Sequence, residues 1–160
     1  MIFVTVGGNT PFDRLIEAVD GWAAEHPEVE LTAQIGPGSY KPQHMPWVAF
    51  LDPSEFQETA RRADLMVSHA GMGTILSATD VGVPLLVLPR KAALNETRND
   101  HQMATVGHLK DRGLFHVADD ESELGAKLDR WQELSACEEP LSDAPLVSLR
   151  SAIVSFIEGP

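Results

Sequence analysis

Short apolar runs alternate with longer amphipathic stretches along this chain, and that alternation restricts the fold more than any other feature. The runs rich in β-forming residues cover residues 2–6, 31–35, 47–51, 65–68, 85–88 and 114–117. The stretch from Pro11 to about Glu25 has helical spacing, with Leu15, Ile16, Val19 and Trp22 on its apolar side. Helices that cover both faces of a mostly parallel sheet produce this pattern. The sequence therefore predicts an α/β fold with a Rossmann-like parallel sheet.

Further helices are expected where polar starts precede apolar spacing. They run from Asp52 to Arg62, Thr74 to Val81, about Asn99 to Arg112, and Asp120 to about Leu134. Residues 146–157 also have helical spacing, and we expect them to pack on the core rather than dock onto a partner. With 160 residues and 43% apolar content, the chain is long enough for one compact domain, residues 1–160.

The charge and the cysteine count exclude several classes of function. The chain has 24 acidic and 12 basic residues, a net charge of -12, which argues against a nucleic-acid partner and against direct adsorption to anionic lipid. A single cysteine, Cys137, excludes an internal disulfide and fits a reducing cytosol. Residues 1–6 indicate a strand rather than a signal peptide, and no apolar run is long enough to span a bilayer. A soluble, cytoplasmic chain is expected.

The turn His69–Thr74 lies between a buried strand and a helix, and it is the first candidate site. Its backbone N–H groups and the helix N-terminus can face an anion. Gly71 and Gly73 allow a phosphate to approach the backbone closely, and Thr74 offers a hydroxyl and an N–H. The alternative is an ordinary tight turn that binds nothing.

A second candidate element, Arg98–Gln102, begins the helix after the next strand. In a parallel sheet both loops lie at the carboxyl edge, where ligands of open α/β folds bind. Asp100 and Gln102 can then hydrogen-bond sugar hydroxyls beside the diphosphate. Asn99 or Asp100 can also cap the helix, which is compatible with binding.

Other ionisable residues have less specific interpretations. His69 is a candidate general base, although a structural or phosphate-positioning role is favoured for a histidine directly after a buried strand. Asp13 is expected to be a helix-start charge, and residues 119–121 a solvated helix start. Arg90 and Lys91 are expected to face solvent, with the donor phosphates as the alternative. No spacing of histidines or carboxylates indicates a metal site, and no cofactor is expected.

Together, the segments Ser68–Thr74, Gly82–Pro89 and Asn99–Gln102 resemble the C-terminal donor domain of glycosyltransferase family 28. Residues 3–7 and 11–15 are similar to its small single-domain members. Those are the soluble subunit of the two-part GlcNAc transferase of N-glycan assembly and the bacterial exopolysaccharide subunits of the same design. The loop Arg90–Gln102 is closer to the bacterial group, and the resemblance covers roughly residues 1–117.

The resemblance implies half of a GT-B glycosyltransferase and assigns roles by position. The turn His69–Thr74 would hold the diphosphate of a UDP-sugar, and residues 34–36 with the segment around Phe50 would frame the uracil. The remaining implied binding residues are Gly7, Gly8 and Asn9 in the cleft between donor and acceptor halves, Gly36 beside the uracil, and Asn99, Asp100 and Gln102 near the donor sugar. Where larger relatives place a glutamate for the ribose hydroxyls, this chain has Ser77, which can donate only one hydrogen bond.

The function implied is that of a UDP-sugar-binding catalytic subunit that transfers a hexose to a lipid-linked acceptor. Because only the donor half is present, activity is expected to need a membrane-anchored, acceptor-binding partner subunit that holds the chain at the inner face of the membrane. The turn would stabilise the departing UDP. A non-catalytic nucleotide-sugar-binding regulatory or scaffold protein is the alternative, and Ser77 fits it. A fragment of a two-domain enzyme is less favoured, because Met1 directly precedes a strand.

Overall fold

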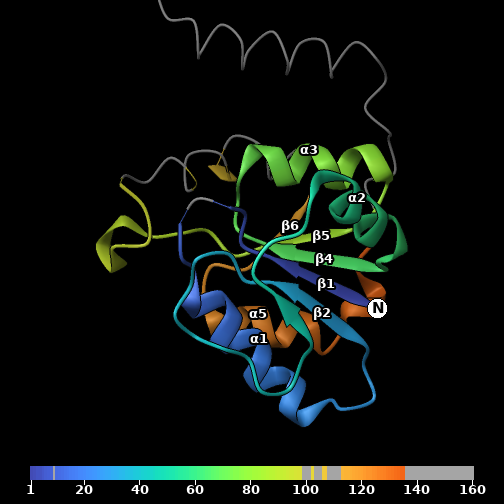
Figure 1. Ribbon diagram of the computed structural model, residues 1–160, viewed down its shortest axis with the longest axis horizontal. Helices are drawn as coiled ribbons and strands as arrows, with labels where there is room; N and C mark the ends of the chain where they lie inside the picture. The colour runs from blue at the N-terminus through green and yellow to red at the C-terminus, as the bar shows by residue number, and fades with distance from the viewer. Residues whose placement is uncertain (9, 99–101, 103–105, 108–112, 136–160) are drawn as a thin grey trace, which may run out of the picture.

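A six-stranded sheet forms the centre of the computed structural model, which describes residues 1–8, 10–98, 102, 106–107 and 113–135 (Figure 1). Its strands are β1 (Ile2–Thr5), β2 (Leu31–Gln34), β3 (Trp47–Val48), β4 (Leu65–Ser68), β5 (Leu85–Val87) and β6 (His116–Val117). The strand order is β3-β2-β1-β4-β5-β6, and each neighbouring pair is parallel. The predicted α/β fold with a Rossmann-like parallel sheet is confirmed.

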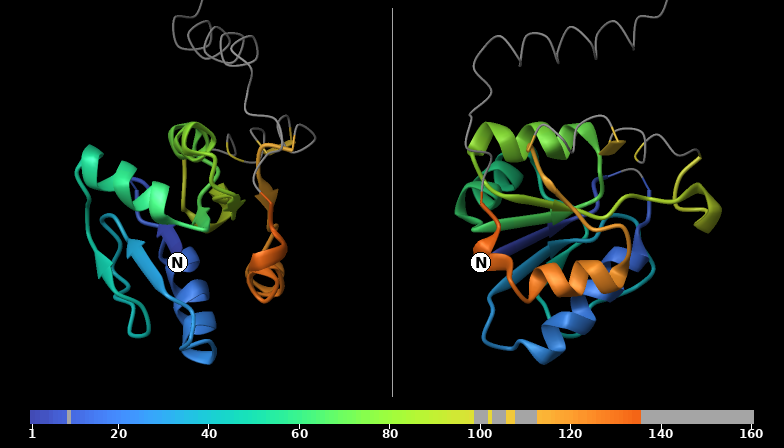
Figure 2. Two further views of the ribbon diagram at one scale, coloured as in Figure 1. Left: turned by 90° about the vertical axis from the view of Figure 1, so that its right-hand side faces the viewer. Right: turned by 180° about the vertical axis from the view of Figure 1, so that it is seen from behind.

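Helices cover both faces of this sheet, as Figure 2 shows. Helices α1 (Asp13–Glu25) and α5 (Glu121–Leu128) pack on one face, and α2 (Pro53–Arg62) and α3 (Met72–Val81) on the other. Two short 3₁₀ helices, η1 (Ala92–Leu94) and η3 (Trp131–Glu133), follow β5 and α5. The fold therefore has three layers, with the core on either side of the sheet.

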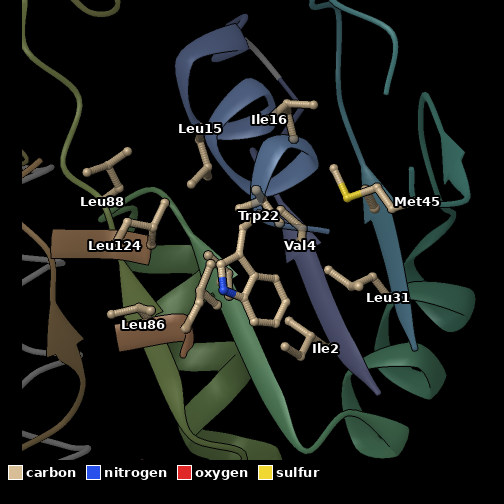
Figure 3. Packing of buried hydrophobic residues seen from close by; sticks show 14 of the residues in the cluster. Ile2, Val4, Leu15, Ile16, Trp22, Leu31, Met45, Leu86, Leu88 and Leu124 are labelled. Atoms are coloured by element: carbon tan, nitrogen blue, oxygen red, sulfur yellow. The ribbon is translucent and has the colours of Figure 1, made fainter. Parts of the chain in front are cut away.

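The apolar runs are nearly continuous because successive side chains of a strand point to opposite faces, and here both faces are buried. In β4, Leu65 and Val67 join the cluster beneath α1 and α5, whereas Met66 joins the cluster beneath α2 and α3. Trp22 of α1 packs against the first of these clusters (Figure 3). A strand with one polar face could not occupy this central position.

Local signals set most of the element boundaries. The Asp52 carboxylate accepts hydrogen bonds from the N–H groups of Ser54 and Glu55, and Glu55 accepts in return from the Asp52 N–H, so α2 begins with a capping box. Gly82 ends α3 in the left-handed conformation, with φ of 72°. These two boundaries follow directly from the residue types.

Several predicted elements are shorter in the structure. Strand β3 ends at Val48 instead of Leu51, because the Leu51 N–H donates to the Gln34 side chain. Strand β6 covers only His116–Val117 of the predicted 114–117. Helix α5 ends at Leu128, before the predicted Leu134, and the carboxylate of its C-cap residue Asp129 accepts from the Trp22 indole N–H.

Parts of two predicted helices lie outside the described residues. Of the helix expected from Asn99 to Arg112, only residues 102, 106 and 107 are described, and all three are helical. The predicted loop after residue 135 and the predicted helix at residues 146–157 lie beyond the described part of the chain. Within the described residues, no helix is long and apolar enough to cross a membrane.

A buried carboxylate fixes the long connection between β2 and β3. Asp20 of α1 is 1% exposed and accepts hydrogen bonds from the N–H groups of Gln43 and His44 and from the Tyr40 hydroxyl. Although burial acts to raise the Asp20 pKa, these hydrogen bonds together hold it below its ordinary value. The connection is thereby tied to α1 at three points.

We predict that Asp20→Ala lowers the free energy of unfolding by about 2–4 kcal/mol, because two backbone N–H groups and a phenol lose their buried acceptor. Since the folded-state pKa of Asp20 is lowered, its contribution is present above the ordinary carboxyl pKa and is lost as the pH falls through the folded-state value. Urea denaturation at pH 7 measures the loss. Glu58→Ala, at an exposed position of α2, is the control and should change stability by less than about 0.5 kcal/mol. Equal stability of the two variants would contradict this account of Asp20.

Candidate functional site

The predicted site residues follow three neighbouring strands at one edge of the sheet. Strand β1 lies between β2 and β4, and all three run parallel. Gly36 follows β2, Gly7 follows β1, and His69 follows β4. Because these strands run in the same direction, the three loops meet at the carboxyl edge, as the sequence predicted.

Close contacts between these loops require glycine at three positions. A Cβ on Gly36 would lie 2.9 Å from the Gly7 carbonyl oxygen, and a Cβ on Gly7 would lie 2.9 Å from Cε1 of His69. A Cβ on Gly71 would lie 2.2 Å from Nε2 of His69. Gly7 and Gly36 also have positive φ, 74° and 61°, which other residues rarely adopt. The imidazole of His69 is therefore packed between Gly7 and Gly71.

The environment of His69 keeps its imidazole neutral. Burial, and secondarily the positive charge of Arg90, lowers the pKa of His69 to about 4. Its buried Nδ1 has no hydrogen-bond partner among the described residues. An imidazole with this pKa is a weak base, so its surroundings favour the phosphate-positioning role over general-base catalysis.

Helix α3 begins without a side-chain cap, as α1 does, but α1 has the acidic residue Asp13 in its first turn. The N-cap of α3, Gly71, makes no side-chain capping bond, and its first turn has no acidic residue, whereas Asp52 caps α2 and Asp120 caps α5. A Cβ at Gly73 would meet no atom of the described residues within 4 Å outside the backbone of its own helix, so this part of the structure leaves the space beside the first turn open. Thr74 is buried at 8% exposure. Uncapped N–H groups beside open space are suited to binding an anion.

The structure also shows how Ser77 and Gln102 are held. The Ser77 hydroxyl donates to the Gly73 carbonyl at 2.9 Å, one turn earlier in α3. Its only proton is thus engaged, which weakens it further as a substitute for a ribose-binding carboxylate. The Gln102 side-chain oxygen accepts from the backbone N–H of Arg90 at 3.2 Å, which places this residue beside the end of β5.

Phe50 lies at the same edge as Gly8. Phe50 is 56% exposed, and its ring is 4.0 Å from where a Cβ of Gly8 would lie. The buried Gln34 supports this region, since its amide donates to the Thr5 hydroxyl and its oxygen accepts from the Leu51 N–H. The structure thus brings Phe50 and Gly8 to an exposed position where a planar ring can stack.

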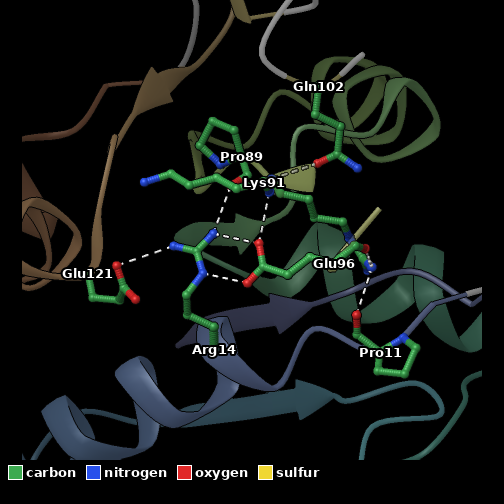
Figure 4. A network of polar contacts seen from close by, with 8 residues as sticks. Pro11, Arg14, Pro89, Lys91, Glu96, Gln102 and Glu121 are labelled. Carbon is green, nitrogen blue, oxygen red and sulfur yellow. Dashed lines mark hydrogen bonds and ion pairs between the residues drawn. The ribbon is translucent and has the colours of Figure 1, made fainter. Parts of the chain in front are cut away.

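The prediction that Arg90 faces solvent is wrong. Arg90 is 2% exposed, and its guanidinium donates to backbone carbonyls of the loop after β1. A second arginine, Arg14, donates to both oxygens of Glu96 and to the Pro89 carbonyl, and lies 3.2 Å from the Glu121 carboxylate (Figure 4). No local signal in the sequence locates Arg90, because the carbonyls of that loop lie about 80 residues away in the chain.

The other predicted residues fall into two groups. Asp13 and Asp120 stand at helix starts as predicted, and Asp13 also accepts from the N–H and hydroxyl of Ser39. Asn9, Asn99 and Asp100 lie outside the described residues, so their binding roles stay predictions. Across residues 1–8, 10–98, 102, 106–107 and 113–135, no group of three histidine, cysteine or acidic side chains could hold a metal ion.

An all-parallel sheet with glycine contacts and an uncapped helix start at its carboxyl edge defines a Rossmann-like domain of the kind found in GT-B glycosyltransferases. The sequence places the chain more narrowly. It belongs to the glycosyltransferase family 28 C-terminal domain family, whose model matches residues 1–152.

Curated relatives are consistent with this family. The chain is 32% identical over 127 residues to the human UDP-N-acetylglucosamine transferase subunit ALG13, which covers 72% of this chain and 11% of that protein. The protein of the same name from Yarrowia lipolytica is 26% identical over 142 residues, covering 78% of this chain and 68% of the relative. The chain thus spans about a tenth of the human relative, but two thirds of the yeast one.

Solved structures show the same fold. An NMR structure of ALG13 matches with a TM-score of 0.61 and 20% identity, covering 89% of this chain and 91% of that one. The kitacinnamycin glycosyltransferase matches with a TM-score of 0.61 and 21% identity, covering 94% of this chain and 38% of its own. For the larger enzyme the matched part is a minority of the chain, which confirms the predicted half of a GT-B fold.

The glycine contacts give a matched pair of variants. We predict that Gly71→Ala lowers the free energy of unfolding by about 1–3 kcal/mol, because its methyl group displaces the His69 ring. The methyl group of Gly73→Ala would enter the open space beside α3, so this variant should be neutral or stabilising by up to about 1 kcal/mol. Thermal and urea unfolding measure both. A Gly71→Ala protein as stable as Gly73→Ala would show that the ring is not confined.

The neutral His69 gives a prediction about pH. NMR titration of the ring nitrogens should show a pKa of about 4, well below the ordinary 6.5. Because the unfolded chain binds this proton more readily, the stability contributed by neutral His69 is present above pH 6.5 and is progressively lost as the pH falls toward 4. A titration midpoint near 6.5 would contradict the buried geometry.

Proposed function

We propose that this chain is the UDP-sugar-binding catalytic subunit of a two-component glycosyltransferase that transfers a hexose to a lipid-linked acceptor in polysaccharide or glycan assembly. The family supplies the reaction class, since the chain belongs to glycosyltransferase family 28. The identities of the sugar, the acceptor and the partner are what we propose.

The observation that carries the proposal is the start of α3. Its first-turn N–H groups lack a side-chain cap, and Gly73 leaves open space beside them. A diphosphate seated there would receive these N–H groups and the positive end of the helix dipole. The exposed Phe50 and the Gln102 side chain then lie on segments that the family resemblance assigns to the uracil and to the donor sugar.

The relatives suggest which donor to test first. The human and Yarrowia lipolytica proteins are named as subunits of a UDP-N-acetylglucosamine transferase. Their names support UDP-GlcNAc as the donor and a second subunit as the partner of this chain. The resemblance of the loop Arg90–Gln102 to the bacterial exopolysaccharide subunits supports other UDP-hexoses as competitors.

The proposed mechanism uses the turn to stabilise the leaving group. As the acceptor oxygen bonds to the anomeric carbon, the bond to the diphosphate breaks and negative charge develops on UDP. Fixed N–H groups at the start of α3 stabilise that charge without reorganising. The neutral His69 positions the turn through its contacts with Gly7 and Gly71. The partner supplies the acceptor and the catalytic base.

The charge of the chain supports recruitment by a protein. A net charge of -12 is repelled by anionic lipid, but it is attracted to a basic surface on a membrane-anchored subunit. We therefore propose a cytoplasmic location at the inner face of the membrane, held there by the acceptor-binding partner.

One observation favours the alternative, a non-catalytic nucleotide-sugar-binding regulatory or scaffold protein. The hydroxyl of Ser77 is engaged with the Gly73 carbonyl, so the ribose lacks the carboxylate that larger relatives provide. Weak donor binding would suit a regulator that releases its ligand readily. Transfer activity with the partner distinguishes the two functions.

Calorimetry on the purified chain tests donor binding. We expect UDP-GlcNAc or another UDP-hexose to bind more tightly than UDP, and Gln102→Ala to remove that preference while leaving UDP binding within about twofold. Gly73→Ala should weaken UDP by about tenfold or more, because its methyl group occupies the open space without disturbing the fold. Glu58→Ala is the inert control.

Transfer assays complete the test. Labelled sugar should reach a lipid-linked acceptor only when the chain is combined with membranes that contain the partner subunit. Binding without transfer in any combination would support the regulatory alternative. No binding of any UDP-sugar by the chain, alone or with the partner, would overturn the proposal.

A further inference from the structure

Arg90 makes an unusual set of hydrogen bonds for a buried charge. It follows β5 and is 2% exposed. Its Nη2 donates to the carbonyls of Val6 and Thr10, both at 2.9 Å, and its Nη1 donates to those of Pro11 at 2.8 Å and Glu96 at 3.1 Å. Three of these four carbonyls belong to the loop between β1 and α1. One guanidinium therefore fixes the loop that contains Gly7 and Gly8.

The main chain of Arg90 holds a second part of the site. Its backbone N–H donates to the Gln102 side-chain oxygen at 3.2 Å. Figure 4 shows Gln102 above Glu96 and Pro11 below it. A single residue thus connects the loop after β1 with the side chain proposed to contact the donor sugar. In the described part of the chain, no other residue forms hydrogen bonds to both the loop after β1 and the Gln102 side chain.

The geometry of these acceptors suits arginine and not lysine. A guanidinium presents five N–H groups in a rigid plane, whereas an ammonium presents three from a single point. The guanidinium carbon also lies 4.8 Å from the centroid of the Phe12 ring, so the ring face supports the same plane. The single nitrogen of a lysine at this position could not donate to all four carbonyls.

Among the described residues, no carboxylate bonds directly to Arg90. The four acceptors of its guanidinium there are backbone carbonyls, and the nearby Glu96 carboxylate accepts instead from Arg14 and from the Lys91 N–H. The Nε of Arg90 is buried without a partner among the described residues. The field of this charge extends to His69, whose pKa it helps to lower. The charge of Arg90 therefore acts on the first residue of the turn that precedes α3.

We propose that Arg90 is a positioning residue of the donor site, which fixes the loop after β1 against Gln102 and supplies buried positive charge that favours a bound diphosphate. This inference rests on the proposed function, because the ligand it serves is the UDP part of the donor. Arg90 acts through the loop and through its electric field, and it does not contact the ligand.

Arg14 provides a matched control for a purely structural role. It contacts Glu96 as Arg90 does, its side chain is 13% exposed, and its hydrogen bonds go to Glu96 and the Pro89 carbonyl. Its guanidinium carbon also lies 5.2 Å from the centroid of the Phe12 ring. Arg14→Met therefore removes a comparable arginine and a comparable ring contact without removing a hydrogen bond to the loop after β1. Arg90→Met removes charge and bonds together, whereas Arg90→Lys keeps the charge and removes the planar set of donors.

The experiment combines UDP calorimetry with NMR of the same variants. We expect both Arg90 variants to raise the Kd for UDP by about tenfold or more and to shift or broaden the Gly7 and Gly8 amide signals, with Arg14→Met within about threefold of wild type. In Arg90→Met the pKa of His69 should rise toward its ordinary value. Arg90→Lys should bind UDP more tightly than Arg90→Met, since it keeps the charge.

Two results would overturn the inference. One is a UDP affinity of Arg90→Met within about threefold of wild type, and the other is an equal loss of affinity in Arg14→Met. If Arg90→Met does not fold, Arg90→Lys carries the same comparison. A wild-type chain that binds no UDP would count against the proposed function, and the Gly7, Gly8 and His69 signals would then decide whether Arg90 fixes the loop. Unchanged signals in both Arg90 variants would show that it does not.

Discussion

Parallel pairing of β1 between β2 and β4 is the constraint on which the rest of the structure depends. Because both faces of β1 are buried, every side chain in it must be accommodated inside, and Ile2, Phe3 and Val4 are each 0% exposed. The same pairing brings the loops after three strands to one edge. Gly36, Gly7 and Gly71 then have no space for a side chain, since each lies against a neighbouring loop or the His69 ring.

The site combines loops that are held in place with a helix start that is open to a ligand. Glycine contacts and the Arg90 hydrogen bonds hold the loops after β1, β2 and β4, while Gly73 leaves space beside the uncapped first turn of α3. Positive electrostatic character comes from two sources there, the helix N-terminus and the buried guanidinium. In a chain with a net charge of -12, these two positive groups lie near each other because the fold places them at one edge of the sheet. They suit the anionic donor that we propose.

Much of the fold could be predicted from residue patterns. The apolar runs located all six strands. Strands β1, β4 and β5 are buried at every position, and a strand buried on both faces must be largely apolar. Both residues of β3 are exposed, so burial does not account for that run. The polar starts at Asp52 and Asp120 located two helices through their capping carboxylates. The glycine turn at 69–74 was located because a strand, a turn and a helix follow one another directly. Strand β3 was predicted too long, since the Gln34 side chain binds the Leu51 N–H.

The sequence by itself determined the α/β class, the order of elements and the segment that begins α3, because those depend on local periodicity and turn chemistry. Only the tertiary structure decided that Arg90 is buried and that the imidazole of His69 lies between Gly7 and Gly71. A lone arginine after a strand looks the same in sequence whether it points to solvent or to neighbouring carbonyls. Its partners are about 80 residues away in the chain, and only the packing of β5 near β1 brings them together.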